Sequence, residues 1–246
     1  MHGLQFQAQD KRRLPTAYFG PESGVGVAVR HVTASPASSG QGGLQIGVIG
    51  LGVGTVAAYG RTGDHVRFYE INPDDIRIAR DTQCFTFLSD SLAQVDVIPG
   101  DGRLSLEREL ADHDPDNFDV LVLDAFSGDA IPVHLLTLEA FETYQRHLKM
   151  PSGILAIHIT NTYLDLRPVV FAAARKLGLS AVFVHSTGDG RVTNPTDWML
   201  VSSPNNPLNT GPSKSASGQD DGDVFRLKTI DPWTDDYSNL IHIIRP

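Results

Sequence analysis

The chain contains the stretch Ile46-Gly47-Val48-Ile49-Gly50-Leu51-Gly52-Val53-Gly54-Thr55, in which apolar residues lead into a turn rich in glycine. Glycines let the backbone turn tightly and let a ligand approach it without a Cβ in the way. The stretch predicts a strand, a glycine turn and the start of a helix, which together fit either a structural turn or a cofactor site. No third glycine stands where a pyrophosphate-binding turn requires one, so a nucleoside without a pyrophosphate is favoured over NAD.

Beyond this stretch, short apolar runs alternate with turns and amphipathic segments as far as about Ser203. Such a pattern predicts helices between parallel strands, and continuous apolar runs are typical of strands that helices cover on both faces. Strands are expected at residues 46–49, 66–70, 95–98, 120–123, 154–159, 181–184 and 198–201. The sequence therefore predicts a doubly wound α/β domain from about Leu44 to about Ser203.

Helix starts between these strands carry capping residues. Asn72 followed by Pro73 and two acids offers an N-cap, a proline at the first helical position and negative charge in the first turn. A second helix is expected after Thr137, and a third between Asp165 and Gly178.

The flanking regions differ from this pattern. Residues 14–29 alternate enough to predict a short β-hairpin, and residues 35–43, rich in Ser, Gly and Pro, predict a linker. Residues 203–223 have little apolar content and predict a flexible loop, with a functional lid as the alternative.

Composition narrows the function classes. The 246 residues include 20 basic and 29 acidic ones, a formal charge of −9 that disfavours nucleic-acid binding and is compatible with a cationic small substrate. The single cysteine, Cys84, excludes an intrachain disulfide and a cysteine-rich metal site. No apolar run approaches the roughly 18 residues of a membrane helix, and the N-terminus has no secretion-signal pattern, so a cytoplasmic protein is expected.

Two acidic residues follow expected strands. Glu70 stands 20 positions beyond Gly50, the distance at which an acid accepts hydrogen bonds from a ribose diol, and this role is favoured over that of a helix-start acid. Asp101, between Gly100 and Gly102, is placed to accept a hydrogen bond from an adenine amino group, with a solvated turn as the alternative.

Asp124 ends a fully apolar strand, where a buried charge is costly unless it has a partner or a task. A carboxylate there can orient an amine and accept its proton, as alkyl transfer to nitrogen requires. Asp129 is a candidate second carboxylate of the same pocket, although a turn position is favoured.

The remaining polar residues give weaker signals. The histidines have no mutual spacing that makes a metal site, so no metal is expected and each is interpreted as a surface or satisfied residue: His31, His134, His147, His158 and His185. Ser127 lacks the glycine two positions earlier that a nucleophile elbow needs, which disfavours a hydrolase.

Four motifs taken together resemble the spermidine synthase family of polyamine aminopropyltransferases. They are Gly50-Leu51-Gly52-Val53-Gly54, Tyr69-Glu70-Ile71-Asn72, Gly100-Asp101-Gly102 and the segment from Leu123-Asp124-Ala125 to Ile131-Pro132. The outer segments 2–5, 15–26 and 233–240 extend the resemblance over nearly the whole chain, and point to the spermidine synthase-like branch whose members are often fused to transporter domains.

The resemblance implies a fold and a reaction. The fold would be the mostly parallel seven-stranded sheet of S-adenosylmethionine-dependent methyltransferases, which is Rossmann-like, over residues 44–246, preceded by a truncated β segment and linker at 1–43. The reaction would transfer an aminopropyl group from decarboxylated S-adenosylmethionine to a small amine such as putrescine, without a metal. A homodimer is also implied.

Residue roles carry over by position. Gly50, Gly52, Gly54 and Glu70 would hold the donor and its ribose, Asp101 and Gly102 its adenine, and Asp124 would orient and deprotonate the amine. The positions that would contact substrate are Gln5, Tyr18, Asp129 and Tyr237.

Two departures affect the substrate more than the adenosyl site. Val53 stands where the family has an aspartate in the glycine loop, and Ser127 stands where it has a second aspartate. Two alternatives therefore stay open: a methyltransferase that uses intact S-adenosylmethionine, and a non-catalytic protein that binds an adenosyl ligand.

Overall fold

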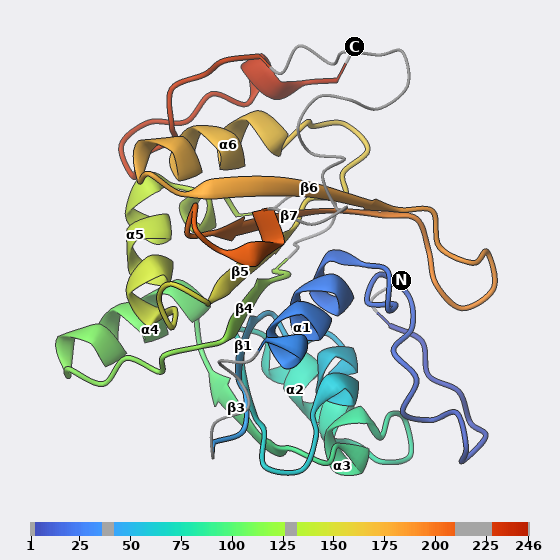
Figure 1. The fold of residues 1–246 in the computed structure, drawn as a ribbon. Coiled ribbons are helices and arrows are strands. Elements are labelled where there is room, and N and C mark those ends of the chain that lie inside the picture. Colours follow the sequence, from blue (N-terminus) through green and yellow to red (C-terminus); the bar gives the residue numbers. More distant parts are fainter. Residues whose placement is uncertain (1–2, 36–41, 126–131, 210–227, 246) are drawn as a thin grey trace.

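The computed structural model describes residues 3–35, 42–125, 132–209 and 228–245, which build a seven-stranded sheet between two layers of helices (Figure 1). The strand order is β3-β2-β1-β4-β5-β7-β6. The strands are β1 (Gln45–Ile49), β2 (His65–Glu70), β3 (Gln94–Pro99), β4 (Val120–Leu123), β5 (Ile154–His158), β6 (Ser180–Ser186) and β7 (Thr196–Ser202). The pairs β5–β7 and β6–β7 are antiparallel and the other pairs of this sheet are parallel, so β7 runs opposite to the other six strands. The predicted doubly wound, mostly parallel, seven-stranded sheet is confirmed, and each predicted strand lies within two residues of its observed bounds.

Helices pack on both faces of the sheet. The α-helices are α1 (Gly24–Ala34), α2 (Pro73–Arg80), α3 (Phe87–Asp90), α4 (Gly102–Ala111), α5 (Leu138–His147) and α6 (Arg167–Lys176). Short 3-10 helices are η2 (Thr55–Tyr59), η3 (Val133–Leu135), η4 (Pro207–Asn209) and η6 (Ile241–Ile243). The core has one cluster that includes residues of α4, α5 and α6, and another that includes residues of α1, η2 and α2.

Strand β4 explains why the central strands are apolar throughout. Val120 and Val122 belong to the core cluster on the α1 side, whereas Leu121 and Leu123 belong to the cluster on the α5 side. All four side chains are 1% exposed or less. A strand covered by helices on both faces has no solvent-facing position, so the period-two pattern of a half-exposed strand is absent.

The hairpin predicted for residues 14–29 is wrong, because most of its second half forms helix α1. The Ser23 hydroxyl caps this helix by accepting a hydrogen bond from the amide of Gly26. The buried apolar residues are Val25, Ala28, Val29 and Val32, which have helical rather than strand spacing. The β-bridge between Ala17 and Thr193 is the one strand-like pairing of residues 14–29.

The predicted helix caps are largely confirmed. Asn72 accepts a hydrogen bond from the amide of Asp74, with Pro73 in the first turn of α2, and Thr137 caps α5 through the amide of Ala140. The helix expected between residues 165 and 178 runs over Arg167–Lys176, with Leu166 at its N-cap position. The glycine turn opens a 3-10 helix, η2, rather than an α-helix.

The segment predicted as a flexible loop, 203–223, is described only as far as residue 209. In that part Asn206 and Leu208 are buried, and η4 begins five residues after the end of β7. Residues 210–223 lie outside the described residues.

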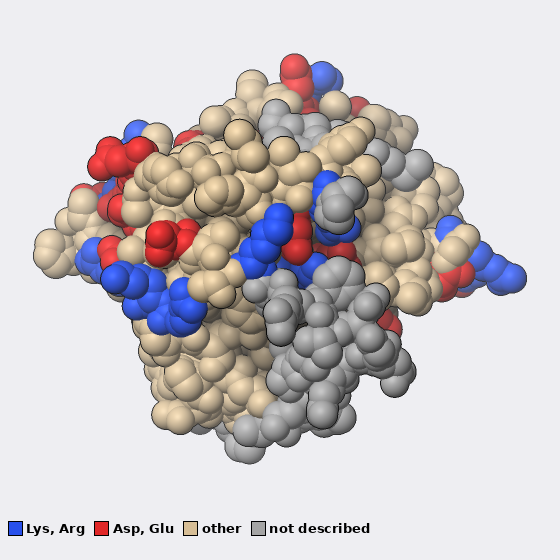
Figure 2. All heavy atoms as spheres, turned by 90° about the horizontal axis from the view of Figure 1, so that it is seen from above, with Lys and Arg blue, Asp and Glu red and all other residues tan. Residues whose placement is uncertain are grey.

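Within the described ranges, no helix has the length and apolar character needed to cross a membrane. On the face drawn in Figure 2, basic side chains of the described residues lie beside acidic ones instead of forming one continuous basic patch.

Candidate active site

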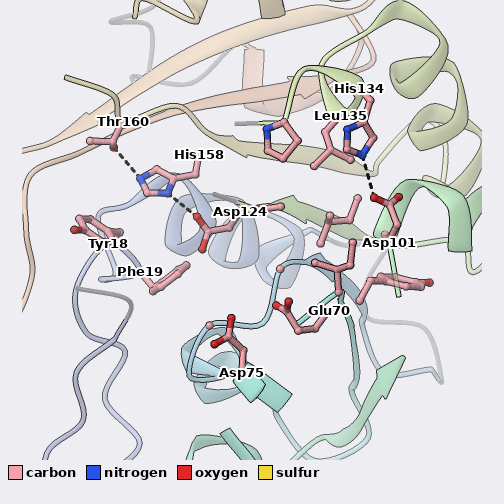
Figure 3. Close-up of a pocket in the computed structure, with 18 of the residues that line it drawn as sticks. Tyr18, Phe19, Glu70, Asp75, Asp101, Asp124, His134, Leu135, His158 and Thr160 are labelled. Carbon is pink, nitrogen blue, oxygen red and sulfur yellow. Dashed lines mark hydrogen bonds and ion pairs between the residues drawn. The ribbon is translucent and has the colours of Figure 1, made fainter. Parts of the chain in front are cut away.

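A cavity of about 410 Å³ opens at the carboxyl ends of the parallel strands β1 to β5 (Figure 3). In an open α/β sheet this edge is where ligands bind, because the loops that follow the strands diverge there. The lining includes the ends of all five strands or the residues just after them: Ile49, Gly50, Glu70, Gly100, Asp101, Asp124, His158 and Thr160.

The glycine turn contributes Gly50 and Gly52 to this cavity, and both have positive φ angles, +97° and +53°. Gly54 and Val53 do not belong to the lining. Val53 is 8% exposed and packs under the N-terminal segment, since a Cβ on Gly3 would overlap its side chain. The residue that departs from the family pattern therefore faces protein, not the cavity.

Glu70 is held rigidly at the end of β2. Its Oε2 accepts a hydrogen bond from the amide of Leu51 at 2.8 Å, and its Oε1 accepts one from the amide of Asn72 at 2.7 Å. The carboxylate thus ties the glycine turn to the start of α2. Because each carboxylate oxygen can accept more than one hydrogen bond, Glu70 keeps acceptor capacity toward the cavity that it lines.

Asp101 has both a capping and a cavity position. Its Oδ1 accepts from the amide of Leu104 at 2.9 Å and so caps α4, while its Oδ2 accepts from Nε2 of His134 at 3.0 Å (Figure 3). Asp101 therefore combines a helix cap with a place in the cavity lining, and its contact with an adenine amino group stays a prediction. His134, which was predicted to be a surface or satisfied histidine, is satisfied by Asp101 and lines the cavity as well.

Asp124 and His158 form a close pair in the cavity wall. Asp124 Oδ1 lies 2.6 Å from His158 Nδ1, and the two side chains are 18% and 5% exposed. The pairing follows from strand register: Leu123 of β4 aligns with Ile157 of β5, which places the next residue of each strand side by side. His158 was predicted to be a surface or satisfied residue; it is satisfied, but it lines the cavity.

The weaker candidates fall in different places. Tyr18 lines the cavity, with its ring centroid 5.3 Å from that of His158. Gln5 does not line it; its side chain bonds the amide and hydroxyl of Thr86. Tyr237 is 54% exposed and lines a separate hollow together with Asp101. Asp129 lies outside the described residues.

The cavity lining is acidic. It includes the four carboxylates of Glu70, Asp75, Asp101 and Asp124, and none of the described residues that line it is a lysine or an arginine. In a partly desolvated cavity such a charge favours a cationic ligand and disfavours an anionic one.

A second acidic cluster surrounds the hydroxyl of Tyr69 in β2, and its carboxylates do not line the cavity. Among the described residues, Glu109, Asp116 and His147 form the group whose atoms lie close enough to hold a metal ion. The guanidinium of Arg67 already pairs with Asp116 at 2.6 Å, which disfavours a second cation. Burial, with the charge of Asp116 as the next cause, raises the pKa of Glu109 to about 7.

Solved structures with similar folds include two with informative names. Human methyltransferase-like protein 13 in complex with SAH has a TM-score of 0.55 and 19% sequence identity, over 73% of this chain and 81% of that one. A probable spermidine synthase from Corynebacterium glutamicum has a TM-score of 0.53 and 22% identity, over 73% of this chain and 61% of that one.

The fold is that of S-adenosylmethionine-dependent methyltransferases. Spermidine synthases share this fold, as the second structure illustrates, and identities this low identify the fold alone. No protein-family model matches the sequence, and no curated protein matches it.

Proposed function

We propose that this protein is a transferase that binds an adenosyl sulfonium donor and alkylates an amine. The donor proposed is decarboxylated S-adenosylmethionine, the group transferred is aminopropyl, and the acceptor is a small amine such as putrescine. The observation that carries the proposal is the acidic cavity at the carboxyl edge of a methyltransferase-like sheet.

Charge distinguishes between the two donors. Decarboxylated S-adenosylmethionine carries a sulfonium and an ammonium group, so both of its charges are attracted by the four carboxylates of the lining. Intact S-adenosylmethionine carries in addition a carboxylate, which needs a cationic or N–H partner when it is desolvated. The described lining offers no lysine or arginine, so a carboxylate would depend on N–H groups alone among four carboxylates, and the proposal therefore favours the decarboxylated donor.

The adenosyl end is assigned to residues at the ends of β2 and β3. Glu70, oriented by the amides of Leu51 and Asn72, would accept the ribose hydroxyls. Asp101 and Gly102 would contact the adenine. A Cβ on Gly102 would lie 2.7 Å from Ile49 Cγ2, so glycine lets the start of α4 pack this close to β1. Gly50 and Gly52 would lie beneath the donor and permit its close approach.

The proposed reaction is a single displacement. The amine nitrogen of the acceptor forms a bond to the aminopropyl carbon attached to sulfur, the C–S bond breaks, and its electron pair stays on sulfur in the neutral thioether methylthioadenosine. Asp124 is the proposed catalytic residue, which orients the acceptor amine and takes the proton that the nitrogen must lose. The sulfonium is already a good leaving group, so the protein mainly positions the two partners and excludes water.

Product analysis tests the proposal. Purified protein is incubated with decarboxylated S-adenosylmethionine, or separately with S-adenosylmethionine, and with putrescine, cadaverine, spermidine or diaminopropane. We expect methylthioadenosine and an acceptor that has gained an aminopropyl group, as seen by mass spectrometry. Adenosylhomocysteine from the second donor would instead identify a methyltransferase.

Two variants decide whether the site is catalytic. Asp124→Asn should reduce turnover by roughly 100-fold or more while donor binding persists. Asp74→Asn, an exposed residue in the first turn of α2, is the matched control and should leave turnover unchanged. A protein that binds either donor but gives no product with any acceptor would be the adenosyl-binding, non-catalytic alternative.

The homodimer and the cytoplasmic location stay predictions. Light scattering on the purified protein decides whether it is a dimer.

A further inference from the structure

The Asp124–His158 pair continues into a chain of hydrogen bonds that ends on strand β7. His158 Nε2 lies 2.8 Å from the hydroxyl of Thr160 and 3.1 Å from that of Thr196. The Thr160 hydroxyl accepts a hydrogen bond from the amide of Asp197 at 2.8 Å, and the Thr196 hydroxyl accepts one from the indole of Trp198 at 2.8 Å. Both hydroxyl oxygens already accept from protein donors, and each can direct its hydrogen to Nε2. The Thr160 hydroxyl also has the carbonyl of Asp197, 3.5 Å away, as a second acceptor.

These contacts determine which nitrogen of His158 carries the proton. The Asp124 carboxylate can only accept, so Nδ1 must donate to it. Nε2 faces two hydroxyls that can donate, so it is the acceptor of the neutral ring. The network therefore holds His158 as the Nδ1–H tautomer (Figure 3).

The ring itself is fixed between two aromatic side chains. Trp198 stacks on it with a centroid distance of 4.7 Å and an interplanar angle of 15°, and Tyr18 lies on it at 5.3 Å. Trp198 is fully buried and its indole nitrogen is bonded to Thr196. A side chain locked by packing and by hydrogen bonds at both ring nitrogens can orient a neighbour with little freedom of its own.

Locking one oxygen of Asp124 leaves the other for a ligand. Oδ1 receives the imidazole hydrogen, and among the described residues none bonds Oδ2. Figure 3 shows the Asp124 carboxylate projecting into the cavity between His158, Phe19 and Glu70. A carboxylate with one oxygen occupied by a neutral donor keeps its negative charge and presents it in one direction.

We propose that His158 is a positioning residue, which fixes Oδ1 of Asp124 and so makes Oδ2 the atom that receives the acceptor amine. This inference rests on the proposed function for the identity of the acceptor. The imidazole does not touch the reacting atoms and takes no proton from the amine. Its effect is on the geometry of Asp124, and hence on the rate with bound acceptor rather than on donor binding.

Asparagine and glutamine substitutions of His158 distinguish its role in positioning Asp124 from a role in filling space. An asparagine amide places its N–H near the position of histidine Nδ1, whereas a glutamine amide places it near Nε2. We expect His158→Asn to keep the donor to Asp124 and retain kcat for putrescine within about tenfold, whereas His158→Gln loses roughly 100-fold. Methylthioadenosine should bind both variants within about twofold of the wild-type affinity. Equal losses in the two variants would overturn the proposal, because the ring would then only fill space.

The exposed pair His185–Asp197 supplies a matched control. His185 Nδ1 also lies 2.6 Å from a carboxylate oxygen, but its side chain is 53% exposed and it does not line the cavity. His185→Asn and His185→Gln should both leave kcat unchanged. A loss in these variants equal to that in His158→Gln would show that any broken histidine–aspartate pair of the sheet has the effect.

Two measurements do not depend on turnover. Nitrogen-15 NMR of the wild-type protein should place the His158 proton on Nδ1, and Asp124→Asn should shift that signal; a proton on Nε2 alone would overturn the proposal. Calorimetry with putrescine and methylthioadenosine should give weaker putrescine binding to His158→Gln than to His158→Asn. If the wild-type protein transfers no aminopropyl group, the proposed function fails, and the NMR measurement, which needs no acceptor, still decides whether His158 donates to Asp124 through Nδ1.

Discussion

The carbonyl oxygen of Asp124 occupies the space that a Cβ on Gly50 would need. The two strand ends are also joined by a hydrogen bond from the amide of Asp124 to the carbonyl of Ile49 at 2.9 Å. The glycine turn and the proposed catalytic aspartate are therefore built as one unit. Gly50 serves here to let two backbone segments meet, in addition to any approach of a ligand.

Gly50→Ala should consequently damage both stability and the site. The φ angle of +97° is unfavourable for alanine, and the new Cβ would push against backbone rather than against a side chain that can rotate. We expect a loss of about 2–4 kcal/mol in the free energy of unfolding, measured by urea denaturation. Gly63→Ala is the control, because Gly63 has a φ of +92° with no atom near its Cβ position, and only the strain of about 1 kcal/mol should appear. Equal losses of unfolding free energy in the two variants would contradict the close packing of Gly50 against the backbone of Asp124.

Glu70→Gln should weaken adenosyl binding more than its small change in shape implies. The amide group of glutamine would point an N–H at one of the two amides, of Leu51 or Asn72, that the carboxylate now accepts from. Hydrogen bonds to a charged group contribute about 1.5–3 kcal/mol, so methylthioadenosine should bind roughly 10- to 150-fold more weakly in calorimetry. Asp74→Asn on the neighbouring helix start should bind normally. If Glu70→Gln binds methylthioadenosine with unchanged affinity, Glu70 does not contribute to adenosyl binding.

The C-terminal segment is joined to helix α4 by Arg103, whose two terminal nitrogens each lie 2.6 Å from an oxygen of Asp235. The guanidinium holds the pKa of Asp235 below its ordinary value of 3.8. A lowered pKa means that the stabilisation is present above this value and disappears as the pH falls through the folded-state pKa. Asp235→Asn should lower Tm at pH 7 by up to about 4 °C, and the gap to wild type should narrow as the pH falls below 3.8.

The control for this effect is Asp236→Asn, the adjacent exposed acid, which has no ion pair within the described ranges. Its Tm should follow that of the wild-type protein from pH 7 to pH 3 in differential scanning fluorimetry. A gap for Asp235→Asn that stays constant over this range would contradict an ionic origin.

The sheet was predictable because its strands carry their own signal. Continuous apolar runs such as Val120–Leu123 occur where both faces are covered, and this burial is a property of each strand by itself. Helix α1 was not predictable in the same way, since Val25-Gly26-Val27-Ala28-Val29 fits a period of two as well as a helical one. The packing of Val25 and Ala28 against the sheet favours the helix, and that packing is tertiary.

The site residues likewise divide into those that local sequence predicts and those that depend on tertiary structure. Glu70, Asp101 and Asp124 could be found because each follows an apolar strand, and the carboxyl ends of parallel strands meet at one edge. His158 carries the same signal at the end of β5, but its pairing depends on the register between β4 and β5. The sequence spacing that identifies metal ligands gives no information about a pair that forms between two strands. The position of Gln5 depends on the path of the N-terminal segment, which no local pattern encodes.

Glu109 gives the protein a pH dependence that is opposite in sign to that of Asp235. Burial and the neighbouring Asp116 raise the pKa of Glu109 from its ordinary 4.5 to about 7. The folded state therefore binds this proton more tightly than the unfolded chain, so the stabilisation is complete below pH 4.5 and is lost as the pH rises through about 7. Above that pH two carboxylates face each other around the Tyr69 hydroxyl, whose single hydrogen they share at 3.0 and 2.8 Å.

Glu109→Gln removes the titration while keeping a neutral group that can donate to Asp116, as the protonated carboxyl does. We expect the variant to be more stable than wild type at pH 8, by about 1 kcal/mol after allowance for partial solvent access, and no more stable at pH 5. Urea denaturation at the two pH values measures the difference. Glu142→Gln, at an exposed position of α5, should show no such change between pH 5 and pH 8. If the difference in free energy of unfolding between Glu109→Gln and wild type is the same at pH 5 and pH 8, Glu109 does not hold the buried proton. Only a group that titrates between these pH values can change that difference.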